Sequence, residues 1–529
     1  MRQHHSLKSV ISFLLGVGLL SSGYAQAEWI KNYSAAAYDV GSMQPAKAGG
    51  FYLNLNSAAK ATGAKNKPLL SLLDNDGNPN WVKQITTGNY DTFYASELAN
   101  GQLLLQGSTQ TTATGKTNPV WALYNVNAET GALTQVFKKT WEGKGNDYLF
   151  FTEDSQGDLV GTGSTTTFNS AGKNDMVLTK VSASTGVPVW SKVYDYNSGD
   201  DVVVSFTPKG NNRYLLLANS EASNGSNQKI LIGLIKSDGV PATGSFKVYG
   251  NNEVITASGV KAISGGNYLV FGTVKSSSND QYPSVFVMKL NSNLVLQWAK
   301  SYSAGADESL SISDINENSD HSLTVSSNLT GMQYINVGGF PVPVGLSAHP
   351  TAIKLSANGS FVSATSYNYQ ASDVANWSQL PGGSYLLTGS TTPAFDPTKP
   401  KVIPNTDMLY GHFNAQLAPN WVKTFATDLY DGGSIMPYNT GYLMNAATID
   451  TQSSNFDVVA GVLNSNGDVA GCSNIQDVTM TETTPSITES TLNWQGTSAA
   501  IKKKGVVTPA DVALKVSNAT VTVTPVCGN

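Results

Sequence analysis

Carboxylates recur at nearly regular intervals along the chain, and carboxylates placed in pairs can act as acid and base in glycoside cleavage. Seven acidic residues lie ten positions after the start of a repeated segment: Asp39, Asp91, Asp147, Asp200, Glu308, Asp373 and Asp431. Gathered at one end of a fold, they would form a negatively charged ring able to hold a cation, a cationic ligand or a polyhydroxyl ligand. The alternative is that each carboxylate accepts N–H bonds from its own loop, which is the usual role of Asp in turns.

Other catalytic signatures are absent from the sequence. After the first 27 residues the histidines are His321, His349 and His412, and their separation does not suggest a zinc site. The chain has no H-E-x-x-H motif and no G-x-S-x-G motif. Asp74-Asn75-Asp76-Gly77 begins like a calcium loop but lacks the bidentate Glu, so we expect a hairpin turn there. We expect no cofactor, although a bound calcium ion is allowed.

The elements that must position the acidic residues come from an internal repeat. Its units begin at positions 29, 81, 137, 190, 245, 298, 363 and 421, with segments such as WIKNY, WVKQI, WSKVY and WAKSY. Within each unit, runs of alternating apolar and polar residues are separated by Gly, Asn, Asp and Ser, as expected of strands. Four short strands in each unit of about 50 residues predict a β-propeller blade, and a stack of sandwiches is the less favoured alternative.

The ends of the repeat region predict how the ring closes. The first segment starts at Trp29, and the eighth unit ends on its third strand near Val462. The N-terminal strand would therefore supply the fourth strand of the last blade and leave no open sheet edge. We predict an all-β, eight-bladed propeller of four-stranded blades over residues 28–470.

We call the first residue of each repeat unit its anchor. The turns before the anchors carry a resemblance to a known family. Ala183-Ser184-Thr185-Gly186 with Trp190, and Asp74-Asn75-Asp76-Gly77 with Trp81, resemble the A-x-D-x-x-T-G-x-x-x-W repeat of eight-bladed quinoprotein-like propellers. The resemblance implies that each Trp docks on the neighbouring blade. Enzymes of that family bind pyrroloquinoline quinone and calcium, often beside a vicinal disulfide. This chain has no adjacent cysteines and no C-x-x-C-H motif, so the resemblance supports the fold and not quinone chemistry.

Long insertions fall between the second and third strands of units six and seven, at 331–350 and 393–407. In a four-stranded meander these connections share a face with the loops that carry the acidic residues. Long loops on a rigid scaffold commonly hold binding sites. We therefore add Tyr334, Phe340, His349 and Phe395 to the candidate ligand contacts; the alternative is solvent-exposed decoration.

The ends of the chain suggest its compartment. Residues 1–27 combine Arg2, Lys8, a short apolar run and Ala25-Gln26-Ala27, which predicts a cleaved secretory signal peptide. The remaining chain has 30 basic and 37 acidic residues, a net charge of −7, which argues against nucleic acid as a partner. No second long apolar run is present, so we expect no membrane insertion. Cys472 and Cys527 are the only cysteines, and in an oxidising compartment they predict a disulfide.

Residues 471–529 break the repeat and are rich in Thr and Val. We expect strand pairs in this disulfide-closed extension, acting as a cap, an attachment element or an assembly contact. The sequence as a whole favours a secreted, non-catalytic binding or cell-surface scaffold protein, extracellular or periplasmic, with a protein or glycan ligand on one propeller face. The alternatives are a polysaccharide hydrolase or lyase that uses the acidic ring, and a structural subunit of a surface assembly.

Overall fold

The computed structural model describes residues 27–36, 38–58, 65–169, 171–210, 213–221, 228–277, 279–337, 340–393, 405–427, 430–450 and 455–528. Nearly all of the predicted signal peptide, residues 1–26, therefore lies outside the described residues. A 3₁₀ turn at Ser264–Gly266 is the one helical element of the described part. No helix in that part is long and apolar enough to span a membrane.

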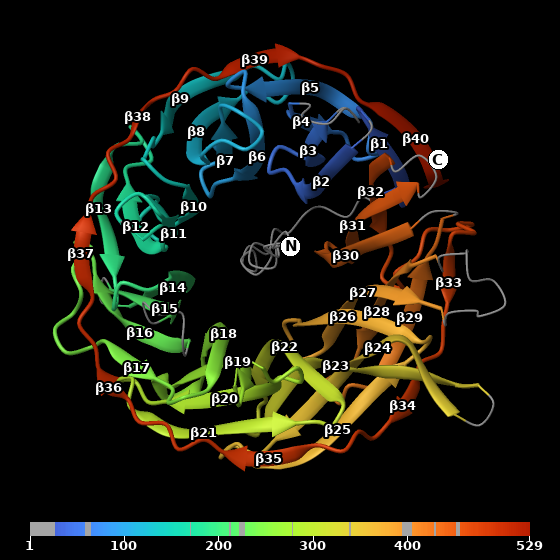
Figure 1. Ribbon diagram of the computed structural model, residues 1–529. Coiled ribbons are helices and arrows are strands. Elements are labelled where there is room, and N and C mark those ends of the chain that lie inside the picture. Colours follow the sequence, from blue (N-terminus) through green and yellow to red (C-terminus); the bar gives the residue numbers. More distant parts are fainter. Residues whose placement is uncertain are drawn as a thin grey trace.

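The strands form eight blades arranged around a central channel, so the predicted fold class is confirmed (Figure 1). Blade 1 contains β2 (Tyr38–Pro45), β3 (Phe51–Ala58), β4 (Lys67–Leu73) and β5 (Pro79–Thr86). Blade 2 contains β6 (Tyr90–Glu97), β7 (Leu103–Gln110), β8 (Asn118–Val126) and β9 (Leu133–Thr140). Blade 3 contains β10 (Asp147–Glu153), β11 (Leu159–Thr165), β12 (Asp175–Val181) and β13 (Pro188–Asp195). Blade 4 contains β14 (Asp201–Lys209), β15 (Arg213–Ser220), β16 (Lys229–Lys236) and β17 (Lys247–Tyr249).

The second half of the ring repeats this plan. Blade 5 contains β18 (Val254–Ala262), β19 (Tyr268–Lys275), β20 (Ser284–Leu290) and β21 (Leu296–Ser303). Blade 6 contains β22 (Glu308–Glu317), β23 (Leu323–Val337), β24 (Phe340–Leu355) and β25 (Phe361–Asn368). Blade 7 contains β26 (Ser372–Gln379), β27 (Tyr385–Thr392), β28 (Asp407–Phe413) and β29 (Pro419–Phe425). Blade 8 contains β30 (Tyr430–Tyr438), β31 (Gly441–Asp450), β32 (Asn455–Leu463) and β1 (Trp29–Ser34).

The N-terminal strand closes the ring as predicted. β1 pairs antiparallel with β32, with Trp29 opposite Val462 and Tyr33 opposite Val458. Because β1 fills the outer position of blade 8, the first and last units of the repeat are joined by a ladder of backbone hydrogen bonds. The edge that an unclosed ring would expose is thereby removed.

The C-terminal extension differs from the expected strand pairs. Its strands run around the circumference of the ring, against the order of the blades, and each one adds a fifth strand to a different blade (Figure 1). They are β33 (Ile475–Asp477), β34 (Thr481–Thr483), β35 (Thr488–Thr491), β36 (Thr497–Ser498), β37 (Lys502–Gly505), β38 (Ala510–Asp511), β39 (Lys515–Asn518) and β40 (Thr522–Gly528). We call residues 471–528 the belt.

Apolar side chains anchor the belt in the packing between blades. Trp494 is 3% exposed and packs edge-on against Phe286, with ring centroids 5.2 Å apart. Met480, Val507 and Leu514 are buried in the same way in other hydrophobic clusters of the ring. Most of the remaining belt side chains are exposed, so these few residues and the backbone ladders hold the belt in place.

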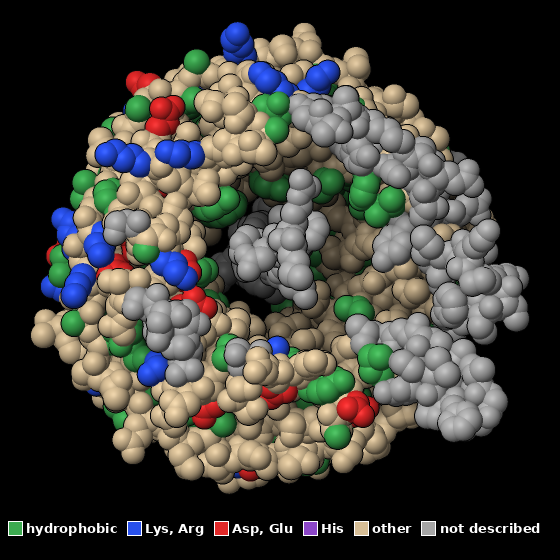
Figure 2. All heavy atoms as spheres, viewed as in Figure 1, with side chains coloured by type: hydrophobic (Ala, Val, Ile, Leu, Met, Phe, Trp, Pro, Cys, Tyr) green, Lys and Arg blue, Asp and Glu red, His purple; other side chains and the backbone are tan. Residues whose placement is uncertain are grey.

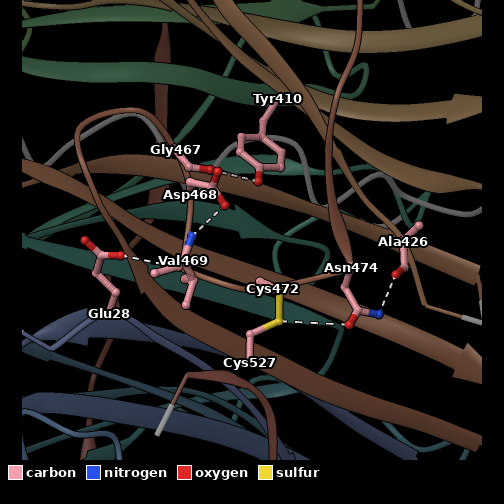
Figure 3. Close-up of a disulfide and its surroundings, with 10 residues drawn as sticks. Glu28, Tyr410, Ala426, Gly467, Asp468, Val469, Cys472, Asn474 and Cys527 are labelled. Atoms are coloured by element: carbon pink, nitrogen blue, oxygen red, sulfur yellow. Dashed lines mark hydrogen bonds between the residues drawn. A yellow bond between two sulfur atoms is a disulfide. The ribbon is translucent and has the colours of Figure 1, made fainter.

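The predicted disulfide is confirmed and closes the belt on itself. Cys472 lies just before β33, and Cys527 lies in β40 at the other end of the belt (Figure 3). Both cysteines are buried against blades 7 and 8, and the Asn474 amide oxygen lies 3.9 Å from the Cys527 sulfur. The bond therefore joins the two ends of a segment that has passed every blade.

Neighbouring blades interlock through the repeated anchor and turn. The Trp190 ring of blade 3 lies over Gly239 in the last hairpin turn of blade 4, where a Cβ would come within 2.6 Å of the indole. The same contact joins Trp29 to Gly77, Trp81 to Gly131, Phe137 to Gly186, Trp298 to Gly359 and Trp421 to Gly467. The anchor is therefore a contact between blades, as the family resemblance implied.

Two junctions use a different pair of residues at these positions. Blades 4 and 6 have Ser245 and Ser363 in place of the aromatic anchor, and the next blades have Leu294 and Leu417 in place of the turn glycine. Both leucines keep a positive φ (59° and 70°) and are 1% and 3% exposed. A buried leucine thus fills the space that the missing aromatic ring would occupy.

The innermost strands frame the channel. Each one covers the second and third strands of the preceding blade, as β10 covers β7 and β8, and β14 covers β11 and β12. In five of these inner strands, a side-chain amide of the preceding blade bonds both the backbone N–H and the backbone C=O of one residue. The pairs include Asn54 with Ala95 and Gln106 with Phe151. The opposite face of each inner strand is left open to the channel.

Candidate functional site

Five of the predicted acidic residues occupy equivalent places at the start of an inner strand, at one end of the channel that we call the mouth. Asp39, Asp91, Asp147, Asp373 and Asp431 are all 0% exposed. Each accepts hydrogen bonds from its own preceding loop; the Asp373 carboxylate, for example, accepts the Tyr369 N–H at 2.7 Å. These contacts are the loop-anchoring alternative raised by the sequence.

The other two predicted positions are displaced from this set. In blade 4 the preceding connection is one residue longer than the repeat suggested, so the equivalent residue is Asp201. Its side chain is 0% exposed. Asp200 instead forms an ion pair with Lys173 at 2.8 Å at the surface. In blade 6 the equivalent residue is Leu310, and Glu308 accepts the Gly305 N–H in the loop before it.

The buried carboxylates are matched by hydroxyl side chains across the ladder. Asp147 pairs with Thr165 and Asp373 with Thr391, and in both pairs the hydroxyl donates to the carboxylate. Where the carboxylate is missing, its partner is apolar as well: Ile255 lies opposite Val274, and Leu310 opposite Leu329. This paired replacement indicates a packing role, because a lone buried hydroxyl or carboxylate would lack a partner.

Burial changes the pKa of several of these carboxyl groups. It raises the pKa of Asp147 and Asp431, the latter to about 6, although hydrogen bonds from their own loops act in the opposite direction. Burial raises the pKa of Asp201 to about 7, and the neighbouring Asp195 and Asp175 carboxylates add to the effect. The half-buried Asp200 behaves differently: the effect of its burial is outweighed by bonds from Lys173 and Asn174, which lower its pKa.

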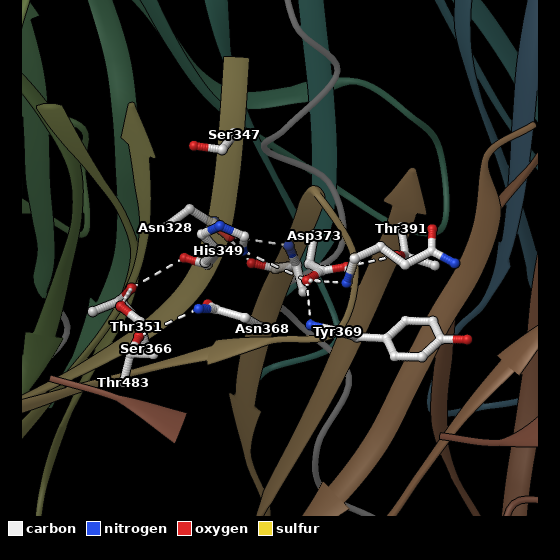
Figure 4. Close-up of polar contacts among 12 residues, drawn as sticks. Asn328, Ser347, His349, Thr351, Ser366, Asn368, Tyr369, Asp373, Thr391 and Thr483 are labelled. Carbon is white, nitrogen blue, oxygen red and sulfur yellow. Dashed lines mark hydrogen bonds and ion pairs between the residues drawn. The ribbon is translucent and has the colours of Figure 1, made fainter. Parts of the chain in front are cut away.

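Two predicted candidates, His349 and Asp373, meet at the mouth between blades 6 and 7. The His349 Nδ1 lies 3.5 Å from the buried Asp373 carboxylate, and the imidazole remains 19% exposed (Figure 4). Glu308 lies on the inner strand of the same blade as His349, and a Cβ on Gly331 would contact both Glu308 and Ser347. The sequence could not have paired His349 with Asp373, because they belong to different blades.

The aromatic candidates belong to the two long insertions of blades 6 and 7. The insertion 331–350 extends the hairpin of β23 and β24 instead of forming an irregular loop, and Figure 1 shows this hairpin projecting beyond the ring. Tyr334 and Phe340 belong to this hairpin, but their side chains lie outside the described residues. Phe395 and most of the insertion 393–407 also lie outside them.

A set of exposed apolar side chains at the mouth was missed by the sequence analysis. Val40, Tyr148, Val202 and Val374 each follow a buried acidic residue directly, and they are 51%, 43%, 43% and 47% exposed. We call these four residues the mouth ring. Their pattern could have been found, because the residue after an inward-packed acid must point to the opposite face of its strand.

The described residues contain no group of three or more His, Cys, Asp or Glu side chains placed to hold a metal ion. The site therefore consists of the buried acids, the His349–Asp373 pair and the mouth ring. Figure 2 shows hydrophobic side chains, with some charged ones, around the central hollow of the ring.

Comparison with known proteins gives little further guidance. No family model and no curated protein matches the chain. Among solved structures, the polysaccharide lyase Uly1 is similar with a TM-score of 0.40 and 9% identity over 87% of this chain and 95% of that one. An exo-β-1,3-galactanase from Phanerochaete chrysosporium, solved with β-1,3-galactotriose, has a TM-score of 0.26 and 10% identity over 87% of this chain and 100% of that one. Similarity at this level carries no argument about the activity of this chain.

Proposed function

We propose that the protein is a non-catalytic binding scaffold that holds its ligand at the mouth of the channel. The observation that carries this proposal is the mouth ring, in which four apolar side chains stay exposed on the rigid inner strands of four blades. Exposed apolar side chains gathered around a concave site commonly mark an interaction surface. The buried acids support the proposal indirectly, since their bonds to their own loops fix the backbone on which the ring is carried.

The proposal includes an extracytoplasmic location, which the disulfide and the predicted signal peptide support. It also includes distant kinship with the quinoprotein-like propellers, without their cofactor. The Trp-over-Gly contacts between blades support this kinship, because the family repeat implied them.

A binding assay with two matched double variants tests the role of the mouth ring. Protein from Glu28 onward would be screened against immobilised extracellular glycans and secreted proteins, with Val202→Ser/Val374→Ser beside Val187→Ser/Val189→Ser. Val187 and Val189 are 51% and 60% exposed but lie at the outer strand β13. We expect the mouth variant to lose about tenfold in affinity and the outer variant to bind normally. Equal binding by both variants would contradict the proposal.

A second candidate, a polysaccharide hydrolase or lyase, is favoured by the His349–Asp373 pair. A carboxylate beside one imidazole nitrogen can orient the ring, leaving the other nitrogen to move a proton. His349→Gln separates the candidates. A catalytic role requires loss of product formation with retained binding, whereas a binding scaffold releases no product before or after the change.

A further inference from the structure

We propose that the ligand of the mouth ring is an uncharged glycan chain that stacks on two aromatic rings of β10. This inference rests on the proposed function and adds the chemical class of the ligand. It is carried by Tyr148 and Phe150, which are 43% and 41% exposed on the same face of one strand.

The packing of β10 explains why these rings are accessible. The alternate residues Leu149 and Phe151 are buried against blade 2, where Phe151 packs against Trp121. The next inner strand, β14, covers β11 and β12 rather than β10. The face of β10 that carries Tyr148 and Phe150 is therefore open to the channel, with the two rings about 7 Å apart along the strand.

The surroundings of the two rings favour a neutral polyhydroxyl ligand. Thr152 continues the open face of β10, and Ser42 and Asn376 occupy channel-facing positions of β2 and β26. Apart from Glu308 at the mouth, the described channel-facing positions between the mouth and the bulges of β14, β18 and β22 carry no charged side chain. An anionic ligand would lose hydration there without gaining a cationic partner, whereas sugar C–H faces can cover aromatic rings while their hydroxyl groups bond to Ser, Thr and Asn.

The inner strand also disfavours an extended peptide as the ligand. A peptide that adds to a sheet edge needs free backbone N–H and C=O groups on that edge. On β10 the Phe151 N–H donates to the Gln106 side-chain oxygen at 2.6 Å, and the Gln106 side-chain nitrogen donates to the Phe151 carbonyl at 3.2 Å. Recognition at this strand must therefore proceed mainly through side chains.

Affinity electrophoresis of the mature protein tests the ligand class. The gels would contain laminarin, β-1,4-galactan or starch as neutral polymers, and alginate or polygalacturonate as acidic ones. We expect at least one neutral polymer to retard the protein and the acidic polymers to have no effect. In Tyr148→Ala/Phe150→Ala the retardation should fall about tenfold, with thermal unfolding unchanged because both side chains are exposed.

Val187→Ala/Val189→Ala is the matched control, since it removes exposed apolar side chains from an outer strand and should migrate as the wild type does. Retardation by acidic polymers alone, or retardation that survives the β10 change, would overturn the inference. Capture of a secreted peptide or protein through the mouth ring, without retardation by any neutral polymer, would also overturn it while leaving the proposed binding function standing.

Discussion

At the scale of single residues, Gly239 shows why the repeated turn carries glycine. Its φ is +77°, and the Trp190 ring of the preceding blade lies where a Cβ would project. Glycine therefore meets two demands at once, a left-handed backbone and a close approach by an aromatic ring. Where the ring is absent, Leu294 and Leu417 show that the backbone requirement alone can be met by another residue.

This contact predicts a large cost for a small change. Gly239→Ala should lower the free energy of unfolding by about 2–4 kcal/mol, because strain at positive φ is combined with a displaced indole. Gly244→Ala is the control, since its φ is +68° and nothing lies within 4 Å of the added Cβ. That change should cost only about 1 kcal/mol. Urea unfolding followed by tryptophan fluorescence measures both, and equal losses would refute the role of the Trp190 contact.

The sequence predicted the anchors, the turns and the position of the acids because all three recur within one unit. It misplaced the equivalents of Asp200 and Glu308, since a change of one or two residues in a connection cannot be detected from spacing alone. It also left the role of the acids open. Whether a carboxylate faces a ligand or its own loop depends on where the loop N–H groups point, and spacing does not contain that information.

At the scale of elements, the belt meets blade 3 beside three buried acids. Asp175 of β12, Asp195 of β13 and Asp201 of β14 are each at most 1% exposed. Lys504 of the belt lies 3.4 Å from Asp195. One lysine cannot balance three carboxylates, so burial and mutual repulsion raise the pKa of Asp175 to about 6 and that of Asp201 to about 7.

This junction predicts a dependence of stability on pH. Folding raises the pKa of these acids, so the folded state binds their protons more tightly than the unfolded chain. The stabilisation is complete below the pKa of about 4 that Asp has in the unfolded chain. It is lost as the pH rises to the folded-state pKa, which is about 7 for Asp201. Asp201→Asn should reduce the loss of unfolding free energy between pH 4 and pH 8 by an amount on the order of 2 kcal/mol. The melting temperature across this pH range follows the change. Asp76→Asn, in an exposed turn, should leave the slope unchanged; a similar slope in both variants would contradict the assignment.

The Thr- and Val-rich extension was expected to hold strands, and β40 carries the apolar alternation that identifies one, but the pairing of the belt strands with the blades could not be predicted. The other belt strands are only two to four residues long and mostly polar. They are strands only because the outer edge of each blade offers a backbone ladder. The buried residues that fix their register, such as Trp494 and Val507, are isolated in sequence and have partners in distant blades.

At the scale of the whole molecule, the disulfide decides whether the belt can leave the ring. Cys527→Ser should keep the ring folded but let the end of the belt separate from β1, because nothing covalent then holds β40. Limited proteolysis with mass spectrometry should show rapid loss of the C-terminal residues in this variant and in reduced wild type. The oxidised wild type should resist under the same conditions. Equal cleavage in all three samples would show that backbone pairing alone retains the belt.

The closed belt also determines how the molecule carries force. Trp29 and Gly528 lie opposite each other in the β1–β40 ladder, so the two ends of the described chain are neighbours. A pull applied at the C-terminal end passes from Cys527 through the sulfur bond to Cys472 and bypasses the residues between them. The tension then passes to blade 8 through Cys472, where the belt begins. The belt therefore carries no tension under a load that would otherwise peel it from all eight blades in turn.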